Sequence, residues 1–151
     1  MKDSFGREIN YLRWSVTDRC NLRCTYCMPQ EKMVFSPRQE LLSIEEMQQL
    51  LGMFYQLGIR KIRFTGGEPL MRKGINQLFE KCNAFPDLKW HITTNGIFVR
   101  QHLESLITNG ISGINLSLDT LDQSKFLSLT RRDLLLPTLE TINEIQKNNI
   151  S

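Results

Sequence analysis

Three cysteines lie close together in the sequence, as Cys20, Cys24 and Cys27. Their spacing, C-x-x-x-C-x-x-C, supplies three thiolates, whereas structural zinc sites take four ligands and most iron–sulfur clusters take four cysteines. Three thiolates can hold a cubane cluster whose fourth iron stays open to a small molecule, and an open position lets a bound metal do chemistry. We therefore predict a reactive metal centre, with a zinc knuckle completed by a fourth ligand as the alternative.

Two further features accompany the cysteines. A cysteine binds iron as a thiolate and a free thiol titrates near pH ~8.5, so the positive charges of Arg19 and Arg23 are expected to favour the thiolate form. The run Gly66-Gly67-Glu68-Pro69 directly follows a predicted strand. Its glycines let the backbone approach a ligand closely, and its proline can begin the next element. A tight turn without a ligand is the alternative.

Together these motifs resemble the signature of the radical S-adenosylmethionine (SAM) enzymes, which have an aromatic residue, here Tyr26, before the last cysteine. A longer string resembles one branch, the GTP 3′,8-cyclases of molybdenum-cofactor biosynthesis (the MoaA family). The resemblance covers nearly the whole chain and rests on Asp3-Ser4-Phe5-Gly6-Arg7, on residues 17–29 and on Thr65-Gly66-Gly67-Glu68-Pro69-Leu70.

The resemblance implies a 4Fe–4S cluster on the three cysteines and SAM chelated at its open iron. One electron passed through the cluster would cleave SAM to methionine and a 5′-deoxyadenosyl radical. This radical would take a hydrogen atom from the GTP ribose, and the resulting ribose carbon radical would attack guanine C8. The cofactor carries this chemistry, and the protein positions and shields it. The partners implied are GTP and an electron-donor protein, and a homodimer is compatible with the resemblance.

The resemblance also assigns individual residues. SAM would be bound by Tyr26, Gly66, Gly67, Glu68, Pro69 and Ser117, and the substrate by Arg13, Arg63 and Thr93. Each guanidinium offers a planar fork to phosphate oxygens. The alternatives are a structural ion pair of the arginines with Asp119 or Glu68, packing of Tyr26 beneath the cysteines, and hydrogen bonds of Ser117 and Thr93 to nearby backbone.

Three other positions have no clear family role. His91 matches no assigned function and is expected to be a polar spacer. Cys82 lies in a helical pattern and is expected to be a buried thiol. The run Thr130-Arg131-Arg132-Asp133 departs from the Thr-Gly-Arg usual in bacterial members. This departure puts a phosphate role for that loop in doubt, with two exposed arginines at a helix end as the alternative.

Strands and helices alternate along the chain. We predict strands at residues 11–17, 61–65, 88–93 and 113–118. Helices are predicted from a capping box of Ser43 and Glu46 to Gly58, at about 74–82 and 98–108, after Asp122, and at 137–148. Four βα units in series imply parallel strands with right-handed crossovers. We therefore predict an α/β fold that forms part of a TIM-like (β/α) barrel.

Alternate residues in every predicted strand split into an apolar and a polar set. Amphipathic helices need the apolar face, so the polar face should line the concave side, which ordinary barrels fill with branched side chains. We predict a ligand-filled cavity there, with a solvated open sheet as the alternative. The polar sets are Arg13/Ser15/Thr17, Lys61/Arg63/Thr65, His91/Thr93/Asn95 and Asn115/Ser117/Asp119.

The chain has 151 residues, whereas a complete barrel takes about 250. Residues 1–151 are therefore expected to be the N-terminal, cluster- and SAM-binding part of a radical SAM core domain. The family's second cluster, held by three further cysteines, has no counterpart here, so this chain alone is predicted not to complete the cyclisation. The alternatives are another radical SAM enzyme with an anionic substrate and a non-catalytic metal-binding module.

Composition and charge bear on whether the protein binds nucleic acid, spans a membrane or is exported. The net charge of +3 is too small to argue for nucleic-acid binding. No apolar run approaches the ~20 residues of a membrane span, and the first residues lack an apolar signal segment. The lack of such a segment favours the cytoplasm as the expected location, and four cysteines in an intracellular chain favour metal ligands over disulfides.

Overall fold

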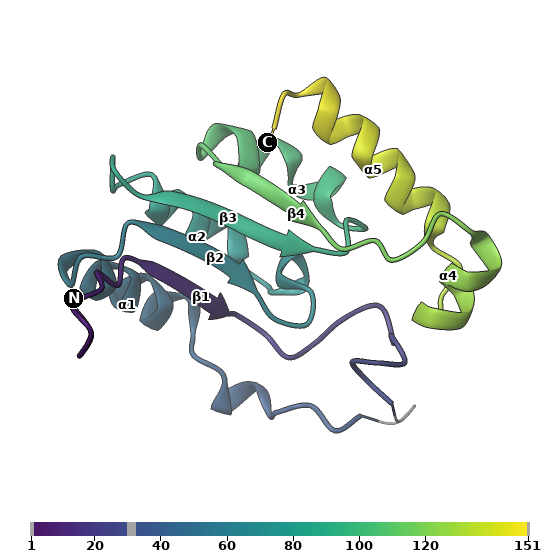
Figure 1. Ribbon diagram of the computed structural model, residues 1–151, viewed down its shortest axis with the longest axis horizontal. Helices are drawn as coiled ribbons and strands as arrows, with labels where there is room; N and C mark the ends of the chain where they lie inside the picture. Colours follow the sequence, from purple (N-terminus) through teal and green to yellow (C-terminus); the bar gives the residue numbers. More distant parts are fainter. Residues whose placement is uncertain (1, 30–32, 151) are drawn as a thin grey trace.

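A computed structural model describes residues 2–29 and 33–150. Its four strands are hydrogen-bonded in chain order, and every neighbouring pair is parallel (Figure 1). The predicted α/β fold with parallel strands is thus confirmed. The first and last strands end two residues earlier than predicted. The strands are β1 (Tyr11–Ser15), β2 (Lys61–Thr65), β3 (Lys89–Thr94) and β4 (Gly113–Leu116).

Two of the α-helices begin where a local side chain accepts a hydrogen bond from a free backbone N–H group. The Ser43 hydroxyl accepts a hydrogen bond from the Glu46 N–H, and the Glu46 carboxylate accepts one from the Ser43 N–H, as the predicted capping box requires. Asp122 caps the fourth helix through Lys125 N–H. The helices are α1 (Ile44–Gln56), α2 (Ile75–Cys82), α3 (Val99–Thr108), α4 (Gln123–Thr130) and α5 (Leu135–Lys147), with short 3-10 turns η1 (Arg38–Glu40) and η2 (Pro69–Met71).

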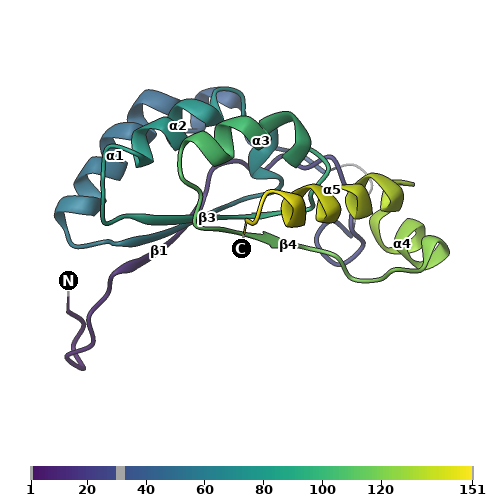
Figure 2. The ribbon, with the colours of Figure 1, turned by 90° about the horizontal axis from the view of Figure 1, so that it is seen from above.

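One face of the sheet is covered by α1, α2 and α3 (Figure 2). The apolar strand residues point toward these helices and form the core, as predicted. Trp90 is 1% exposed, and its ring stacks on that of Phe79 with centroids 4.7 Å apart. Its indole N–H donates to the carbonyl of Asn109 over 3.1 Å, so the large ring is buried without an unpaired polar group.

The other face carries the polar residues in layers set by the strand register. Arg13, Arg63 and His91 form one layer across β1, β2 and β3. The next layer toward the carboxyl ends of the strands contains the small side chains Ser15, Thr65, Thr93 and Asn115. The predicted separation into two faces is therefore confirmed. Within residues 2–29 and 33–150, no helix has the length and apolar character needed to cross a membrane.

Candidate functional site

The segment that follows β1 contains the three cysteines, and residues 18–29 are called the cysteine loop below. The backbone of this loop is tied to the end of α4, because the N–H groups of Arg23 and Thr25 donate to the carbonyls of Thr130 and Leu129 over 3.0 and 2.9 Å. A turn inside the loop adds a bond of 2.8 Å from Met28 N–H to the Cys24 carbonyl. The loop is thus held by backbone bonds to an element far away in the sequence.

The glycine pair after β2 holds the other side of the cysteine loop. Gly67 N–H donates to the Thr17 carbonyl and Glu68 N–H to the Arg19 carbonyl, both over 2.7 Å. A Cβ at Gly67 would clash with the Arg19 carbonyl and lie 2.8 Å from the Asp18 carbonyl oxygen. A Cβ at Gly66 would likewise clash with the carbonyl of Thr17. Both glycines are therefore required because two backbone segments approach each other closely here. The reason predicted from the sequence was instead the close approach of a ligand.

The side chains of Glu68 and Pro69 are buried in the protein. The Glu68 side chain is 0% exposed, and its carboxylate accepts hydrogen bonds from Leu70 N–H, the Thr94 hydroxyl and Asn95 N–H. Burial raises the pKa of this carboxyl above its ordinary value, although the three hydrogen bonds oppose the shift. Glu68 thereby joins the turn after β2 to the end of β3, and only its backbone remains a candidate SAM contact.

A cavity of about 540 Å³ lies between the cysteine loop and the carboxyl ends of the strands. It brings together most of the predicted site residues, while Arg63, Glu68 and Pro69 are not among its lining residues. The predicted cavity on the polar face is thus present at this end, whereas Lys61, farther down the face, is exposed. The predicted site residues that line it are Arg13, Cys20, Cys24, Tyr26, Cys27, Gly66, Gly67, Thr93 and Ser117.

The cysteines lie at one wall of this cavity. Burial raises the pKa of the Cys20 and Cys24 thiols, and Cys27 is exposed. The guanidinium groups of Arg19 and Arg23, which were predicted to favour the thiolates, both lie over the Phe35 ring, and Arg23 also donates to the Cys20 and Leu22 carbonyls. In the part of the chain that is described, no three His, Cys, Asp or Glu side chains converge closely enough to hold a metal ion.

Buried polar atoms without partners surround the cysteines nevertheless. Asp18 Oδ1, Arg19 Nε and Asn21 Nδ2 are buried and make no hydrogen bond. Each such group costs about 1–3 kcal/mol when it stays unsatisfied. A cluster bound to the loop would bring sulfur acceptors close to the two donors. Three thiols at one wall of the cavity, with unpaired N–H groups on neighbouring residues of the same loop, therefore fit an iron–sulfur cluster.

Tyr26 spans the mouth of the cavity. Its hydroxyl donates to Asp119 Oδ2 over 2.6 Å, and the side chain is 61% exposed. The hydrogen bond to Asp119, together with burial, raises the pKa of Tyr26 far above its ordinary value. This exposure argues against the alternative in which Tyr26 packs beneath the cysteine loop. The residue instead joins that loop to the segment after β4.

The two predicted substrate arginines are neighbours in the strand register. Among the residues described, neither forms an ion pair, and Arg63 Nε is buried without a hydrogen-bond partner. The alternative of a structural ion pair is therefore not realised, since Asp119 bonds Tyr26 and Glu68 bonds the end of β3. Next to Arg63, the pKa of His91 is lowered by burial and by the positive charges around it. Two neighbouring guanidinium groups without an acidic partner are favourable surroundings for an anion.

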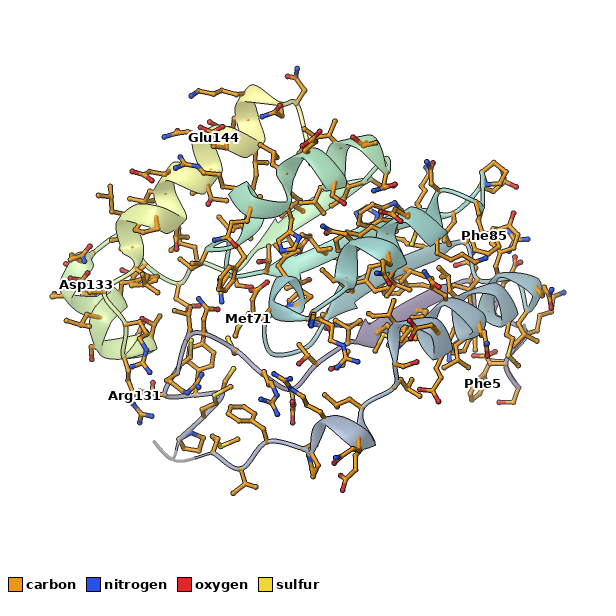
Figure 3. All side chains as sticks on the ribbon, turned by 180° about the vertical axis from the view of Figure 1, so that it is seen from behind. Phe5, Met71, Phe85, Arg131, Asp133 and Glu144 are labelled. Atoms are coloured by element: carbon orange, nitrogen blue, oxygen red, sulfur yellow. The ribbon has the colours of Figure 1, made fainter. Side chains whose placement is uncertain are left out.

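Arg131 contacts the cysteine loop directly. Its backbone has a φ of 55°, a left-handed conformation in which a glycine is more usual. Its guanidinium donates to the carbonyls of Met28 and Pro29 over 3.0 and 3.1 Å. Figure 3 shows Arg131 at the end of α4, next to the segment that follows β1. The alternative of two exposed arginines therefore holds for Arg132 alone, whereas Arg131 clamps the cysteine loop. Cys82, by contrast, is the expected buried thiol, with its pKa raised by burial to about 12.

One site residue was not singled out from the sequence. Asn95, which lies just after β3, donates from its amide nitrogen toward Cys20 Sγ over 3.7 Å and to Asn21 Oδ1 over 2.8 Å. Its place in the polar set of the third strand was the available signal. The run Asn95-Gly96 indicated only the end of that strand.

The family of the chain follows from comparison with known proteins. The model of the radical SAM superfamily matches residues 14–151. The chain therefore belongs to the radical SAM superfamily, a family of enzymes that use a 4Fe–4S cluster and SAM.

Among known proteins of this superfamily, the chain is similar in sequence to GTP 3′,8-cyclases. The GTP 3′,8-cyclase of Rhizobium etli is 48% identical over 154 residues, which cover 99% of this chain and 44% of that protein. The GTP 3′,8-cyclase of Peptoclostridium acidaminophilum is 46% identical over 147 residues, covering 95% of this chain and 45% of that protein. The chain thus spans less than half the length of these relatives, in agreement with the predicted resemblance.

Solved structures agree in fold. The structure of SuiB from Streptococcus suis bound to S-adenosylmethionine superposes with a TM-score of 0.79 at 20% identity, over 94% of this chain and 32% of that one. HydG, a maturase of the FeFe-hydrogenase, superposes with a TM-score of 0.61 at 15% identity, over 89% of this chain and 32% of that one. These likenesses support the predicted partial β/α barrel.

Proposed function

We propose that this chain forms the cluster- and SAM-binding part of a GTP 3′,8-cyclase. The observation that carries the proposal is one cavity bordered by the cysteine loop, the glycine turn and the hydroxyl-bearing strand ends, with Arg13 at its edge and Arg63 beside it. Cys20, Cys24 and Cys27 would hold the cluster. Bound there, cluster and SAM together supply a radical that can remove hydrogen from a substrate.

The chain's own residues would orient SAM within the cavity. Tyr26 is already held across the mouth by Asp119, which leaves its ring available to an adenine. The backbone of the Gly66-to-Pro69 turn is fixed by its bonds to the cysteine loop and can present carbonyl groups to an ammonium. Ser117 also lines the cavity and offers a hydroxyl. Pre-organised groups of this kind lower the cost of binding.

The substrate would lie over the cationic layer, with its phosphates on Arg13 and Arg63. The two guanidinium groups lack acidic partners among the residues described, and phosphate oxygens satisfy such groups through paired charge-assisted hydrogen bonds. Thr93 lies one layer closer to the cysteines and would contact the nucleoside. Complete cyclisation, a second cluster and an electron-donor partner are proposed for a protein of the relatives' full length.

The cluster assignment is tested by anaerobic reconstitution with iron and sulfide, followed by metal and sulfide quantitation. About four irons per chain are expected, with 5′-deoxyadenosine produced when SAM and dithionite are added. Cys24→Ser should lose both, and Cys82→Ser serves as a matched control because that thiol is buried away from the loop. One zinc per chain with no brown absorbance would instead establish a metal-binding module.

The substrate assignment is tested by equilibrium binding of GTP to the reconstituted protein. We expect Arg13→Ala and Arg63→Ala each to weaken binding at least tenfold, since a charge-assisted hydrogen bond contributes about 1.5–3 kcal/mol. Arg100→Ala is the matched control, because Arg100 lies on α3 near Glu140 and Glu144. Equal affinity in all four proteins would contradict the substrate assignment and leave the cluster assignment intact.

A further inference from the structure

The Asn95 side chain lies against a cysteine of the proposed cluster. Asn95 follows β3 and is 8% exposed, so its amide is almost entirely removed from solvent. Its Nδ2 is 3.7 Å from Cys20 Sγ and 2.8 Å from Asn21 Oδ1. One amide hydrogen can therefore be directed at the cysteine sulfur while the other bonds the neighbouring asparagine.

The position of this amide is fixed by several contacts. Asn95 N–H donates to the buried carboxylate of Glu68 over 2.8 Å, and Asn95 Oδ1 accepts from Ile97 N–H over 3.2 Å. The Thr94 hydroxyl donates to the same carboxylate over 2.8 Å. Both ends of the Asn95 amide are thus engaged within one buried network. Such a network keeps a side chain in a single orientation.

The neighbouring Asn21 shows that more donor capacity is present than the chain itself uses. Asn21 Nδ2 is buried and lacks a hydrogen-bond partner, although its Oδ1 accepts from Asn95. A buried N–H group is normally paired in a folded protein. A sulfur-rich group on Cys20 would supply the missing acceptors, so both asparagine amides are arranged for such a group.

An N–H donor at a ligating sulfur has a definite effect on a cluster. Reduction adds one negative charge, part of which resides on the sulfur atoms, and a hydrogen bond to sulfur stabilises the reduced form. A donor fixed at Cys20 Sγ therefore favours the reduced form of the cluster.

We propose that Asn95 is a positioning residue that orients Cys20 and raises the reduction potential of the cluster through an N–H···S hydrogen bond. The inference rests on the proposed cluster at Cys20, and it extends that proposal to a residue that does not itself bind iron, SAM or substrate. Asn21 assists by holding the amide of Asn95.

The test is a redox titration of the reconstituted chain, followed by the electron paramagnetic resonance signal of the reduced cluster. Asn95→Leu keeps the volume of the side chain and removes the donor. We expect about tenfold less reduced cluster at a fixed applied potential, which for one electron corresponds to a downward shift of about 59 mV. Thr94→Val is the matched control, because it disturbs the same Glu68 network without removing a donor to Cys20.

A second variant covers the case in which Asn95→Leu does not fold. Asn95→Ser keeps a side-chain oxygen for the turn to Ile97 N–H, as serine commonly does, and is too short to reach Cys20. A downward shift in either asparagine variant, with Thr94→Val unchanged, supports the inference. Equal potentials in all variants overturn it while the cluster assignment stands. A parent chain that binds no 4Fe–4S cluster overturns both proposals.

Discussion

Replacing Gly67 by alanine tests whether the glycine turn exists to hold the cysteine loop. The added Cβ would clash with the Arg19 carbonyl and lie 2.8 Å from the Asp18 carbonyl oxygen. Cβ atoms are essentially never found within 3.0 Å of another heavy atom. Both groups belong to the backbone, so no side-chain rotation can relieve the overlap. The loop must therefore move away from the turn after β2.

The cost can be worked from the bonds that this movement breaks. Separation removes the hydrogen bonds from Gly67 N–H to Thr17 and from Glu68 N–H to Arg19, each contributing about 1 kcal/mol. Residual overlap adds about 1–3 kcal/mol. We expect Gly67→Ala to lower the free energy of unfolding by about 3–5 kcal/mol. Iron binding should fall with it, because the three cysteines lie on the displaced loop.

Urea denaturation followed by tryptophan fluorescence measures the first effect, and iron per chain after reconstitution measures the second. Gly52→Ala is the matched control. Gly52 lies within α1, and a Cβ there would meet only the Phe85 ring at 3.9 Å, an ordinary contact. Alanine should stabilise that helix by up to about 1 kcal/mol. If Gly67→Ala stays within 1 kcal/mol of the parent protein, the argument from close backbone approach is refuted.

Three further predictions concern other parts of the chain. Arg131→Gly should change the unfolding free energy little, because relief of the left-handed backbone strain, about 1 kcal/mol, offsets the lost hydrogen bonds. Amide hydrogen exchange in the cysteine loop should become faster in this variant. Unchanged exchange would show that Arg131 does not hold the loop in place. GTP affinity should rise as pH falls from 7.5 to 5.5, since the pKa of His91 is lowered in the free protein and bound phosphates would raise it. Calorimetry should show that the GTP affinity of His91→Gln depends less on pH than that of the parent protein. The same pH dependence in both proteins would contradict a role for His91. Ser43→Ala should cost about 1 kcal/mol in urea denaturation, whereas Ser43→Asp should retain the cap.

Local rules were sufficient for the elements and for the two faces of the sheet. Strand alternation separated Arg13, Arg63 and His91 from the core because side chains on a strand point to opposite faces in turn. The capping box at Ser43 was predictable because its partner, Glu46, lies only three residues away. The cysteine spacing and the glycine run likewise indicated the family, since both motifs are short and continuous.

Contacts between distant segments could not be obtained in this way. Tyr26 bonds a residue 93 positions later, Asn95 reaches a cysteine 75 positions earlier, and Arg131 clamps a carbonyl 103 positions away. A residue type allows many such partners, and only the packing of β3, α4 and the cysteine loop selects one. The order of strands and helices could therefore be predicted from short-range sequence patterns, whereas the surroundings of each cysteine depend on how segments distant in the sequence pack against one another.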